Sequence, residues 1–327
     1  ALNVASVASV FKKTLYQPLS RLSGLLAMSL LVGGLSVLVL DLGRPDRLII
    51  AMTYYNFKSV FAWNIFLYTG LLVVVAVYLW MMFEPRMNRF IGSAGKVAFT
   101  WRLVLTIGTG SIFGVLVARE AFGSVVLIPM FIAMSLSFGT AVMLLAIILM
   151  FRMSNLSVKD EVVTRLRSLL AYFVIAVAFF VAVDHLTRLY AVGYTGVERF
   201  LLVEGGIYPV LFWAGQCLLG TVIPVIVLLT PRLAGRLPTV VASLLVLLGA
   251  FAQLYVLIVG GQAFPMDIFP GYTENSLYFD GVVAGYHPSL PELALGFGGI
   301  GLALLIALLA TRVLPFLPQA PADQPGG

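Results

Sequence analysis

The stretch LSGLLAMSLLVGGLSVLVL, residues 22–40, contains no charged side chain and runs directly into LDLGRPDR, residues 40–47. A helix rises about 1.5 Å per residue and a bilayer core is about 30 Å thick, so this apolar stretch is long enough for one crossing. Four charges, a glycine and a proline then end the apolar run. The pattern predicts a membrane-spanning helix that stops at a membrane surface.

The rest of the chain has the same character. Of its 327 residues, 61% are hydrophobic and 10% are charged, and the mean hydropathy is +1.05. A typical soluble domain is about 45–50% apolar and about 25% charged. Transmembrane β-barrels alternate apolar and polar residues over segments of roughly ten residues, whereas these apolar runs are continuous. The sequence therefore predicts an all-α fold, a polytopic transmembrane helix bundle.

Eight spans follow from the apolar runs. They cover about residues 22–40, 60–83, 97–118, 122–150, 168–192, 207–230, 239–260 and 293–314. We expect one membrane domain over residues 1–318 and a mobile tail, rich in proline and glycine, over residues 319–327. Residues 1–16 read as the end of a preceding helix and a linker, so we expect N-terminal helices to be missing from this sequence.

Cysteine and histidine are scarce. The single cysteine, Cys217, excludes an intrachain disulfide, a CxxC metal site and a cysteine-ligated iron–sulfur cluster within this sequence. With only His185 and His287 beside it, we expect no metal site. The net charge of +6 does not indicate nucleic-acid binding, because basic loops at a membrane surface account for it.

The basic residues favour one side of the membrane. Alternate loops, beginning with the one before the first span, hold most of the twenty lysines and arginines. The positive-inside rule makes these loops cytoplasmic. The opposite, outer side carries most of the acidic residues and the long segment 261–291, which lies between the last two spans.

Several motifs together carry a family resemblance. They are LDLGRPDR (40–47), the basic linker FKKTLYQPLSRLSGLLA (11–27), GGQ (260–262), GYHPSLPE (285–292) and the ending TRVLPFLP (311–318). With these motifs the chain resembles the NrfD/PsrC-like family, the membrane subunits of polysulfide-reductase-type complexes. The late spans look like its ten-helix subgroup, which includes DsrP of the Dsr sulfite-reduction-associated complex and the hydrogenase-2-type membrane subunits.

This resemblance implies a subunit that binds menaquinone or ubiquinone near the outer face of a prokaryotic cytoplasmic membrane. It implies electron exchange with a periplasmic ferredoxin-like iron–sulfur subunit. Further partners would be other subunits of a respiratory redox complex, such as a multihaem cytochrome and catalytic subunits. The quinone would be the cofactor, and the chain would hold no redox centre of its own.

Ionisable groups near the outer end of the fifth span are the first site candidates. Asp184 and Arg188 stand at i and i+4, so they can pair on one helix face. His185 points about 100° away, where it can donate to a quinone oxygen or relay a proton. Because charge within a membrane is costly, we predict Asp184 and His185 as catalytic and His185 and Arg188 as quinone-binding. A structural ion pair beside a hydrogen-bonded histidine is the alternative.

Two further sets are candidates. Thr109 and Ser111 lie between glycines in the third span and are predicted to bind quinone, with small-residue helix packing as the alternative. Tyr286 and His287 open the last span and are predicted to bind quinone, and Glu292 is predicted to be catalytic. A helix cap is the alternative for Glu292, because an acid in the first turn suits the helix dipole.

Asp41, Arg44 and Asp46 of the LDLGRPDR motif are predicted to dock the partner subunit, with a solvated interfacial turn as the alternative.

Other functions compete with quinone binding. One is a membrane anchor or proton-conducting subunit without a quinone site, although the scarcity of acids in the inner halves of the spans argues against pumping. A solute transporter would show inverted repeats, and none is visible.

Overall fold

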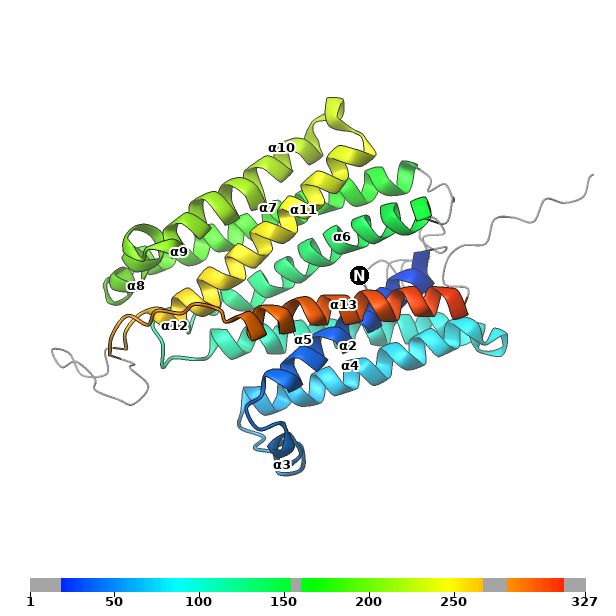
Figure 1. Ribbon diagram of the computed structural model, residues 1–327, viewed down its shortest axis with the longest axis horizontal. Helices are drawn as coiled ribbons and strands as arrows, with labels where there is room; N and C mark the ends of the chain where they lie inside the picture. Colours follow the sequence, from blue (N-terminus) through cyan, green and yellow to red (C-terminus); the bar gives the residue numbers. More distant parts are fainter. Residues whose placement is uncertain (1–18, 154–159, 267–280, 315–327) are drawn as a thin grey trace, which may run out of the picture. The chain divides into compact units, whose positions relative to one another are not determined.

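The computed structural model describes residues 19–153, 160–266 and 281–314. In this part of the chain every regular element is helical, and eight helices are long and apolar enough to cross a membrane (Figure 1). The long helices are α2 (Ser20–Asp41), α4 (Val60–Phe83), α5 (Ile91–Gly114), α6 (Leu127–Met153), α7 (Asp160–Tyr190), α11 (Arg236–Tyr255) and α13 (Leu290–Val313). The remaining span, Ile207–Leu229, combines α9 (Ile207–Val210), a π-helical segment (Leu211–Val222) and α10 (Ile223–Leu229). The predicted all-α bundle with eight spans is confirmed.

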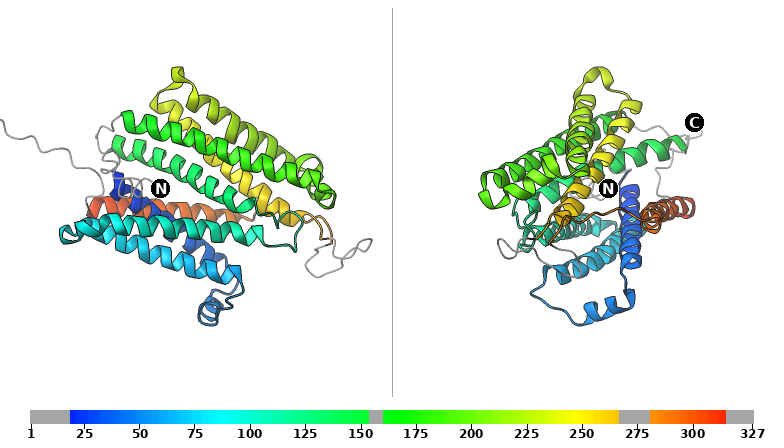
Figure 2. Two further views of the ribbon diagram at one scale, coloured as in Figure 1. Left: turned by 180° about the vertical axis from the view of Figure 1, so that it is seen from behind. Right: turned by 60° about the vertical axis from the view of Figure 1, so that its left-hand side comes forward.

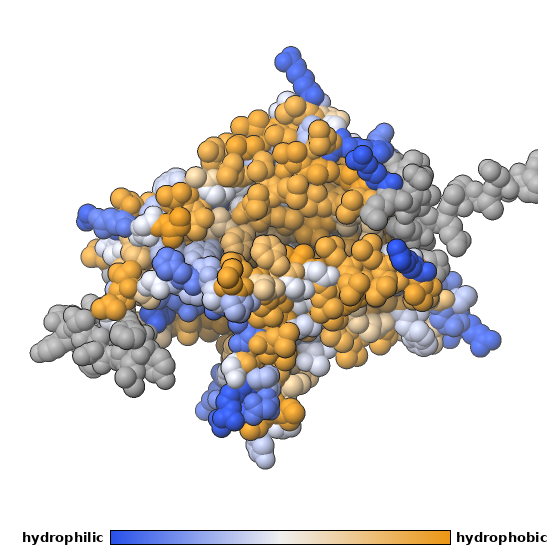
Figure 3. Space-filling model, in the orientation of Figure 1, coloured by the Kyte–Doolittle hydropathy of each residue, from blue (hydrophilic) through white to orange (hydrophobic). Residues whose placement is uncertain are grey.

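Short elements join these spans. They are α3 (Leu48–Thr53), α8 (Thr195–Arg199), α12 (Gly261–Ala263) and two more π-helical segments, Phe200–Glu204 and Val256–Gly260. Hydrophobic residues cover the lengths of the helices and hydrophilic residues gather near their ends (Figure 3). That distribution suits helices whose sides face lipid and whose ends face water. The chain is therefore a multi-pass integral membrane protein.

Helix ends differ from the expected bounds where a tight turn intervenes. The third and fourth spans were expected at 97–118 and 122–150, but α5 ends at Gly114 and α6 begins at Leu127. Between them Gly123 adopts a φ of 77° and donates its N–H to the carbonyl of Phe113. A positive φ is easily adopted by glycine, so this residue allows the chain to turn back early. The predicted segments 1–16 and 319–327 lie outside the described residues.

The chain forms two compact units, and the single membrane domain over residues 1–318 stays a prediction. The first unit comprises Ala1–Leu105, Met150–Val158 and Pro288–Gly327, and the second comprises Thr106–Leu149 and Lys159–His287. In the first unit α13 crosses α2 (Figure 2). A Cβ on Gly33 of α2 would lie only 2.6 Å from the carbonyl oxygen of Gly299, so small residues allow this close approach. The hydrophobic core of the first unit lies between α2, α4 and the first half of α5.

The second unit contains the candidate site. Its core is formed by α6, α7, the span Ile207–Leu229 and α11 with the π segment that follows it. Gly220 and Gly249 bring the π segment Leu211–Val222 against α11, since a Cβ on Gly220 would lie 2.5 Å from the Cα of Gly249. One end of this unit holds the C-terminal turns of α7 together with α8 and α12 (Figure 1). Three buried charged residues of this unit, Asp184, Arg188 and Glu198, lie at that end, whereas the buried Arg167 bonds carbonyls at the other end of the span Ile207–Leu229.

Candidate functional site

The last turns of α7 hold a buried ion pair. Arg188 Nε lies 3.1 Å from Asp184 Oδ2, and each residue is only 5% exposed. The hydroxyl of Ser124 donates to Asp184 Oδ1, and Arg188 Nη1 donates to the backbone carbonyl of Glu120 at 3.0 Å. The i, i+4 pairing expected from sequence is therefore present, and the loop between α5 and α6 supplies its other hydrogen bonds.

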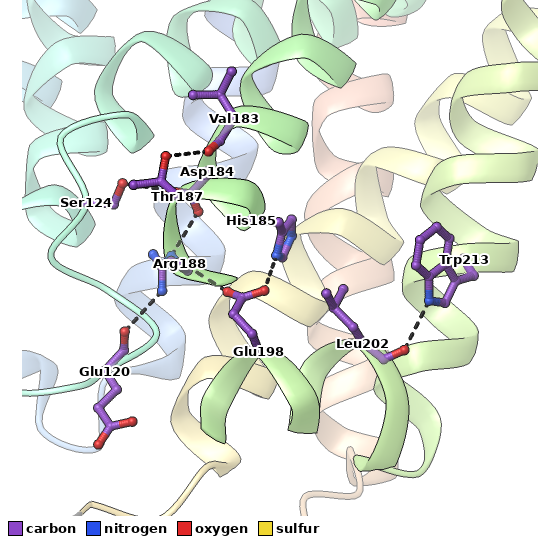
Figure 4. A network of polar contacts seen from close by, with 10 residues as sticks. All are labelled: Glu120, Ser124, Val183, Asp184, His185, Thr187, Arg188, Glu198, Leu202 and Trp213. Atoms are coloured by element: carbon purple, nitrogen blue, oxygen red, sulfur yellow. Dashed lines mark hydrogen bonds and ion pairs between the residues drawn. The ribbon is translucent and has the colours of Figure 1, made fainter. Parts of the chain in front are cut away.

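A second carboxylate extends this pair to His185. Glu198, on α8, is fully buried, and its Oε2 lies 2.6 Å from His185 Nδ1. Its other oxygen, Oε1, lies 3.8 Å from Arg188 Nε. Figure 4 shows the Glu198 carboxylate between the guanidinium of Arg188 and the imidazole of His185. Asp184, His185, Arg188 and Glu198 therefore form one cluster, which we call the acid–histidine cluster.

Sequence reasoning did not select Glu198. It lies in the connection between two spans, where an acid reads as a solvated loop residue. The one signal is its position between Val197 and Leu201, an i, i+4 apolar pair of which both members are buried. This pair indicates that one face of the short helix α8 packs inward. It does not indicate what that face contacts.

The acid–histidine cluster lines a small cavity of about 30 Å³. The remaining walls are Ala121, Met130, Val181, Leu201, Gln216, Gln253, Val256 and Leu257. Each of the three π-helical segments contributes to this wall, and π-helical turns are frequent at functional sites. A cavity of this volume holds about one or two water molecules, which is less than a quinone ring occupies.

The cluster has an unbalanced charge. With a neutral imidazole, two carboxylates oppose one guanidinium, so the formal charge is minus one. A proton on His185 would neutralise the cluster, which matters because an uncompensated charge is costly within a membrane. His185 Nδ1 is engaged by Glu198, and the Phe212 ring packs edge-on against the imidazole at 4.8 Å between centroids. Because Nδ1 is engaged by Glu198, Nε2 is the nitrogen of His185 that remains for a ligand. The arrangement can hold, accept and release a proton.

The other predicted site residues lie apart from this cavity wall. Thr109 and Ser111 are half-buried in α5, and the Ser111 hydroxyl donates to the Ile107 carbonyl of its own helix. His287 is exposed, and the Tyr286 ring lies 6.5 Å from that of Tyr255.

Glu292 belongs to the first unit. Its carboxylate accepts from the N–H of Ser289 and forms a capping box at the start of α13. The proposed docking residues Asp41, Arg44 and Asp46 are exposed near the end of α2, and Arg44 and Asp46 lie 3.7 Å apart. The roles predicted for all these residues stay predictions.

Metal ligands do not gather within the described residues. No group of three or more His, Cys, Asp or Glu side chains is arranged there to hold a metal ion. Cys217 is a half-buried free thiol in the π segment Leu211–Val222.

Comparisons with known proteins add a family. Residues 1–266 match the family model described as polysulphide reductase, NrfD. The chain is 27% identical to the Hdr-like menaquinol oxidoreductase integral membrane subunit of Archaeoglobus fulgidus, over 99% of this chain and 82% of that protein. It is 26% identical to a putative dimethyl sulfoxide reductase membrane subunit of Halobacterium salinarum, over 98% of this chain and 80% of that protein. It is 27% identical to a polysulfide reductase polypeptide of Wolinella succinogenes, over 74% of this chain and 82% of that protein.

Proposed function

The chain belongs to the NrfD polysulfide reductase family, and we propose that it is the quinone-reacting membrane subunit of a respiratory redox complex. The family expected from the sequence motifs is confirmed by the match over residues 1–266. The narrower likeness to the ten-helix subgroup, and within it to DsrP or the hydrogenase-2-type subunits, stays a prediction. Menaquinol appears in the name of the Archaeoglobus fulgidus relative, which favours menaquinone among the quinones for this chain.

The acid–histidine cluster is the observation that carries the proposal. Quinol oxidation releases two electrons and two protons, so its site needs a group that accepts a proton without leaving a charge stranded in the membrane. His185 meets that need, because a proton there neutralises the net charge of the two carboxylates and one arginine. General bases are found within hydrogen-bond reach of the group they deprotonate.

Each member has a distinct role in this proposal. His185 exchanges a proton with the quinone oxygen through Nε2. Glu198 holds the imidazole by its Nδ1 and stabilises the imidazolium, and Arg188 keeps both carboxylates in place. Because the cavity of about 30 Å³ is smaller than a quinone ring, binding requires it to widen. The three π-helical segments in its wall are the elements we expect to move.

The proposal extends to partners and orientation. The relatives are named for oxidoreductase and reductase complexes, which supports other subunits for this chain. We propose that a periplasmic ferredoxin-like iron–sulfur subunit exchanges electrons with the bound quinone. In this orientation the cluster lies near the outer face of a prokaryotic cytoplasmic membrane. The basic loops are then cytoplasmic, and segment 261–291 lies outside.

Quinone binding to the purified complex tests the proposal. A fluorescent menaquinol analogue is titrated into wild type and into His185→Ala. We expect saturable quenching in wild type and a dissociation constant at least about tenfold higher in the variant, equivalent to the loss of about 1.4 kcal/mol. Thr187→Ala is the matched control, because Thr187 is an exposed neighbour on α7 whose hydroxyl bonds only its own helix, at the Val183 carbonyl.

Two results would contradict the proposed site or the function. Unchanged affinity in His185→Ala would move the site toward Thr109 and Ser111 or toward Tyr286 and His287. Absence of binding to wild type would favour the alternative, a membrane anchor or proton-conducting subunit without a quinone site.

A further inference from the structure

A second cavity lies directly beside the acid–histidine cluster. It measures about 10 Å³, and Ser137 of α6 and Thr221 are among its walls. Gln216 and Gln253 line both this cavity and the larger one. The two amides therefore form the partition between the cluster and a pocket deeper within the second unit.

Some residues that line these two cavities carry buried polar atoms without a hydrogen-bond partner among the described residues. Ser137 is 1% exposed, and its hydroxyl has no hydrogen-bond partner within the described residues. The same holds for Arg188 Nη2 and Glu198 Oε1 at the larger cavity. A buried polar atom left unpaired costs about 1–3 kcal/mol, and such atoms are commonly satisfied by internal water. Both cavities include polar side chains in otherwise apolar walls, and both reach the volume of about one water molecule.

The partition is polar rather than closed by apolar side chains. Gln216 and Gln253 are each buried, and the one hydrogen bond of the Gln253 side chain within the described residues is a weak 3.9 Å contact from Nε2 to Met130 Sδ. An amide offers two donors and one carbonyl oxygen, so most of this capacity is available to other partners. Water on either side of the partition would use it.

We propose that Gln216 and Gln253 hold a line of internal water that joins the acid–histidine cluster to the Ser137 cavity and takes up protons from the cluster. The presence of water stands independently of the proposed function, whereas the proton transfer rests on it. The amides are positioning residues: they orient water through hydrogen bonds and neither gain nor lose a proton.

The proton balance is simple. Oxidation of a quinol gives two electrons to the partner subunit and two protons to the site. A proton accepted at His185 passes to the nearest water of the line, which holds it as hydronium beside the negatively charged cluster. The cluster thereby returns to its charge of minus one and accepts the second proton, which stays on His185, so that one proton lies on the water line, one on the imidazole, and both electrons on the partner subunit. Glu198 Oε1 and Arg188 Nη2 are the cluster atoms that contact this first water.

Radiolytic hydroxyl-radical footprinting with mass spectrometry tests for the water itself. Met130 is 3% exposed and lines the larger cavity, whereas Met143, at 0%, lines neither cavity. In the purified complex we expect Met130 to be oxidised at least about tenfold faster than Met143, because radicals form from water in contact with the side chain. Gln253→Leu should slow oxidation of Met130 alone. Equal oxidation rates of Met130 and Met143 in the wild-type complex would overturn the proposal that water occupies the larger cavity.

Steady-state quinol oxidation tests the proton transfer. Ser137→Ala and Gln253→Leu should each lower kcat by about tenfold and raise the solvent deuterium isotope effect. In Ser137→Ala, whose side chain lines only the smaller cavity, analogue affinity should stay within about twofold of wild type. Gln253→Asn, which keeps the amide donors and acceptor, should restore more of the rate than Gln253→Leu retains. Ser243→Ala is the matched control, because that buried hydroxyl donates to the Thr239 carbonyl and lines neither cavity.

The outcomes separate the two proposals. Ser137→Ala is a small change that preserves packing. If this variant had the same kcat and isotope effect as wild type, the proton route would be overturned, even if Gln253→Leu failed to assemble. If the wild-type complex did not bind the analogue, the proposed function would be overturned. The oxidation of Met130 would still support internal water.

Discussion

At the scale of single residues, Glu198 organises the candidate site. Its two oxygens face two different groups, the imidazole of His185 and the guanidinium of Arg188. A fully buried carboxylate in a membrane protein is sustained only by such partners. Removing it leaves His185 Nδ1 without its hydrogen-bond partner, whereas replacing it with an amide of the same shape keeps the packing.

Substitution of Glu198 should separate these two effects. Glu198→Ala should lower the free energy of unfolding by about 1–3 kcal/mol, because the buried Nδ1 of His185 loses its hydrogen-bond partner. It would be measured by thermal or detergent-induced unfolding of the purified complex. Glu198→Gln should be less destabilising but should slow quinol oxidation, since a proton on His185 would then leave a net positive charge.

Glu204 gives the matched control for this change. It is an exposed carboxylate paired with Arg199, and exposed pairs contribute about 0–1 kcal/mol. Glu204→Ala should therefore leave both stability and turnover near wild type. If Glu198→Ala were as stable as Glu204→Ala, the cluster would not be the buried network described here.

At the scale of elements, glycines decide where helices touch. Gly33 and Gly34 are neighbours in α2, yet they face different surroundings. A Cβ on Gly33 would meet the Gly299 carbonyl and lie 3.1 Å from the Ala303 Cβ, both on α13, whereas a Cβ on Gly34 would meet no atom within 4 Å. Backbone atoms cannot rotate away, so only the first substitution forces the two helices apart.

This pair of glycines gives an internally controlled prediction. Gly33→Ala should destabilise the protein by about 1–3 kcal/mol through overpacking. Gly34→Ala should be neutral or stabilising by up to about 1 kcal/mol, because alanine is the better helix former. Thermal unfolding of the two purified variants would measure the difference. Equal effects would show that α2 and α13 do not pack through Gly33.

At the scale of the whole molecule, orientation follows from charge. The loops predicted to be cytoplasmic include the turn Pro231–Leu233, and the connection that contains Val192 belongs to the predicted outer side. The span Ile207–Leu229 separates the two positions. The positive-inside rule predicts orientation from loop charge alone. Labelling one residue on each side of a single span therefore tests the predicted orientation directly.

Cysteine labelling in intact cells measures this orientation. Cys217→Ser removes the one native cysteine, and Val192→Cys or Arg232→Cys then adds a single thiol. A membrane-impermeant maleimide should label Val192→Cys from outside, since Val192 is 87% exposed. Arg232→Cys should be labelled only in inverted vesicles. The reverse pattern would place the acid–histidine cluster at the cytoplasmic face.

Sequence determined what is local to one helix. Continuous apolar runs of about twenty residues fix eight spans, because a bilayer demands that length and admits few charges. The i, i+4 spacing of Asp184 and Arg188 fixes their pairing, since both lie on one helix face. The LDLGRPDR and GYHPSLPE motifs indicated the family, which the match over residues 1–266 confirms.

Tertiary structure decided which helix faces meet. No periodicity along α7 shows that His185 contacts Glu198, thirteen residues later and on another helix. Nor does any local pattern show that Gln216 and Gln253, on different spans, share the walls of two cavities. Such contacts depend on close approaches like that of Gly220 to Gly249, which set the rotation of one helix against another. Hydropathy reports that a helix is in the membrane, but only packing decides which of its faces meets a neighbour and which meets lipid.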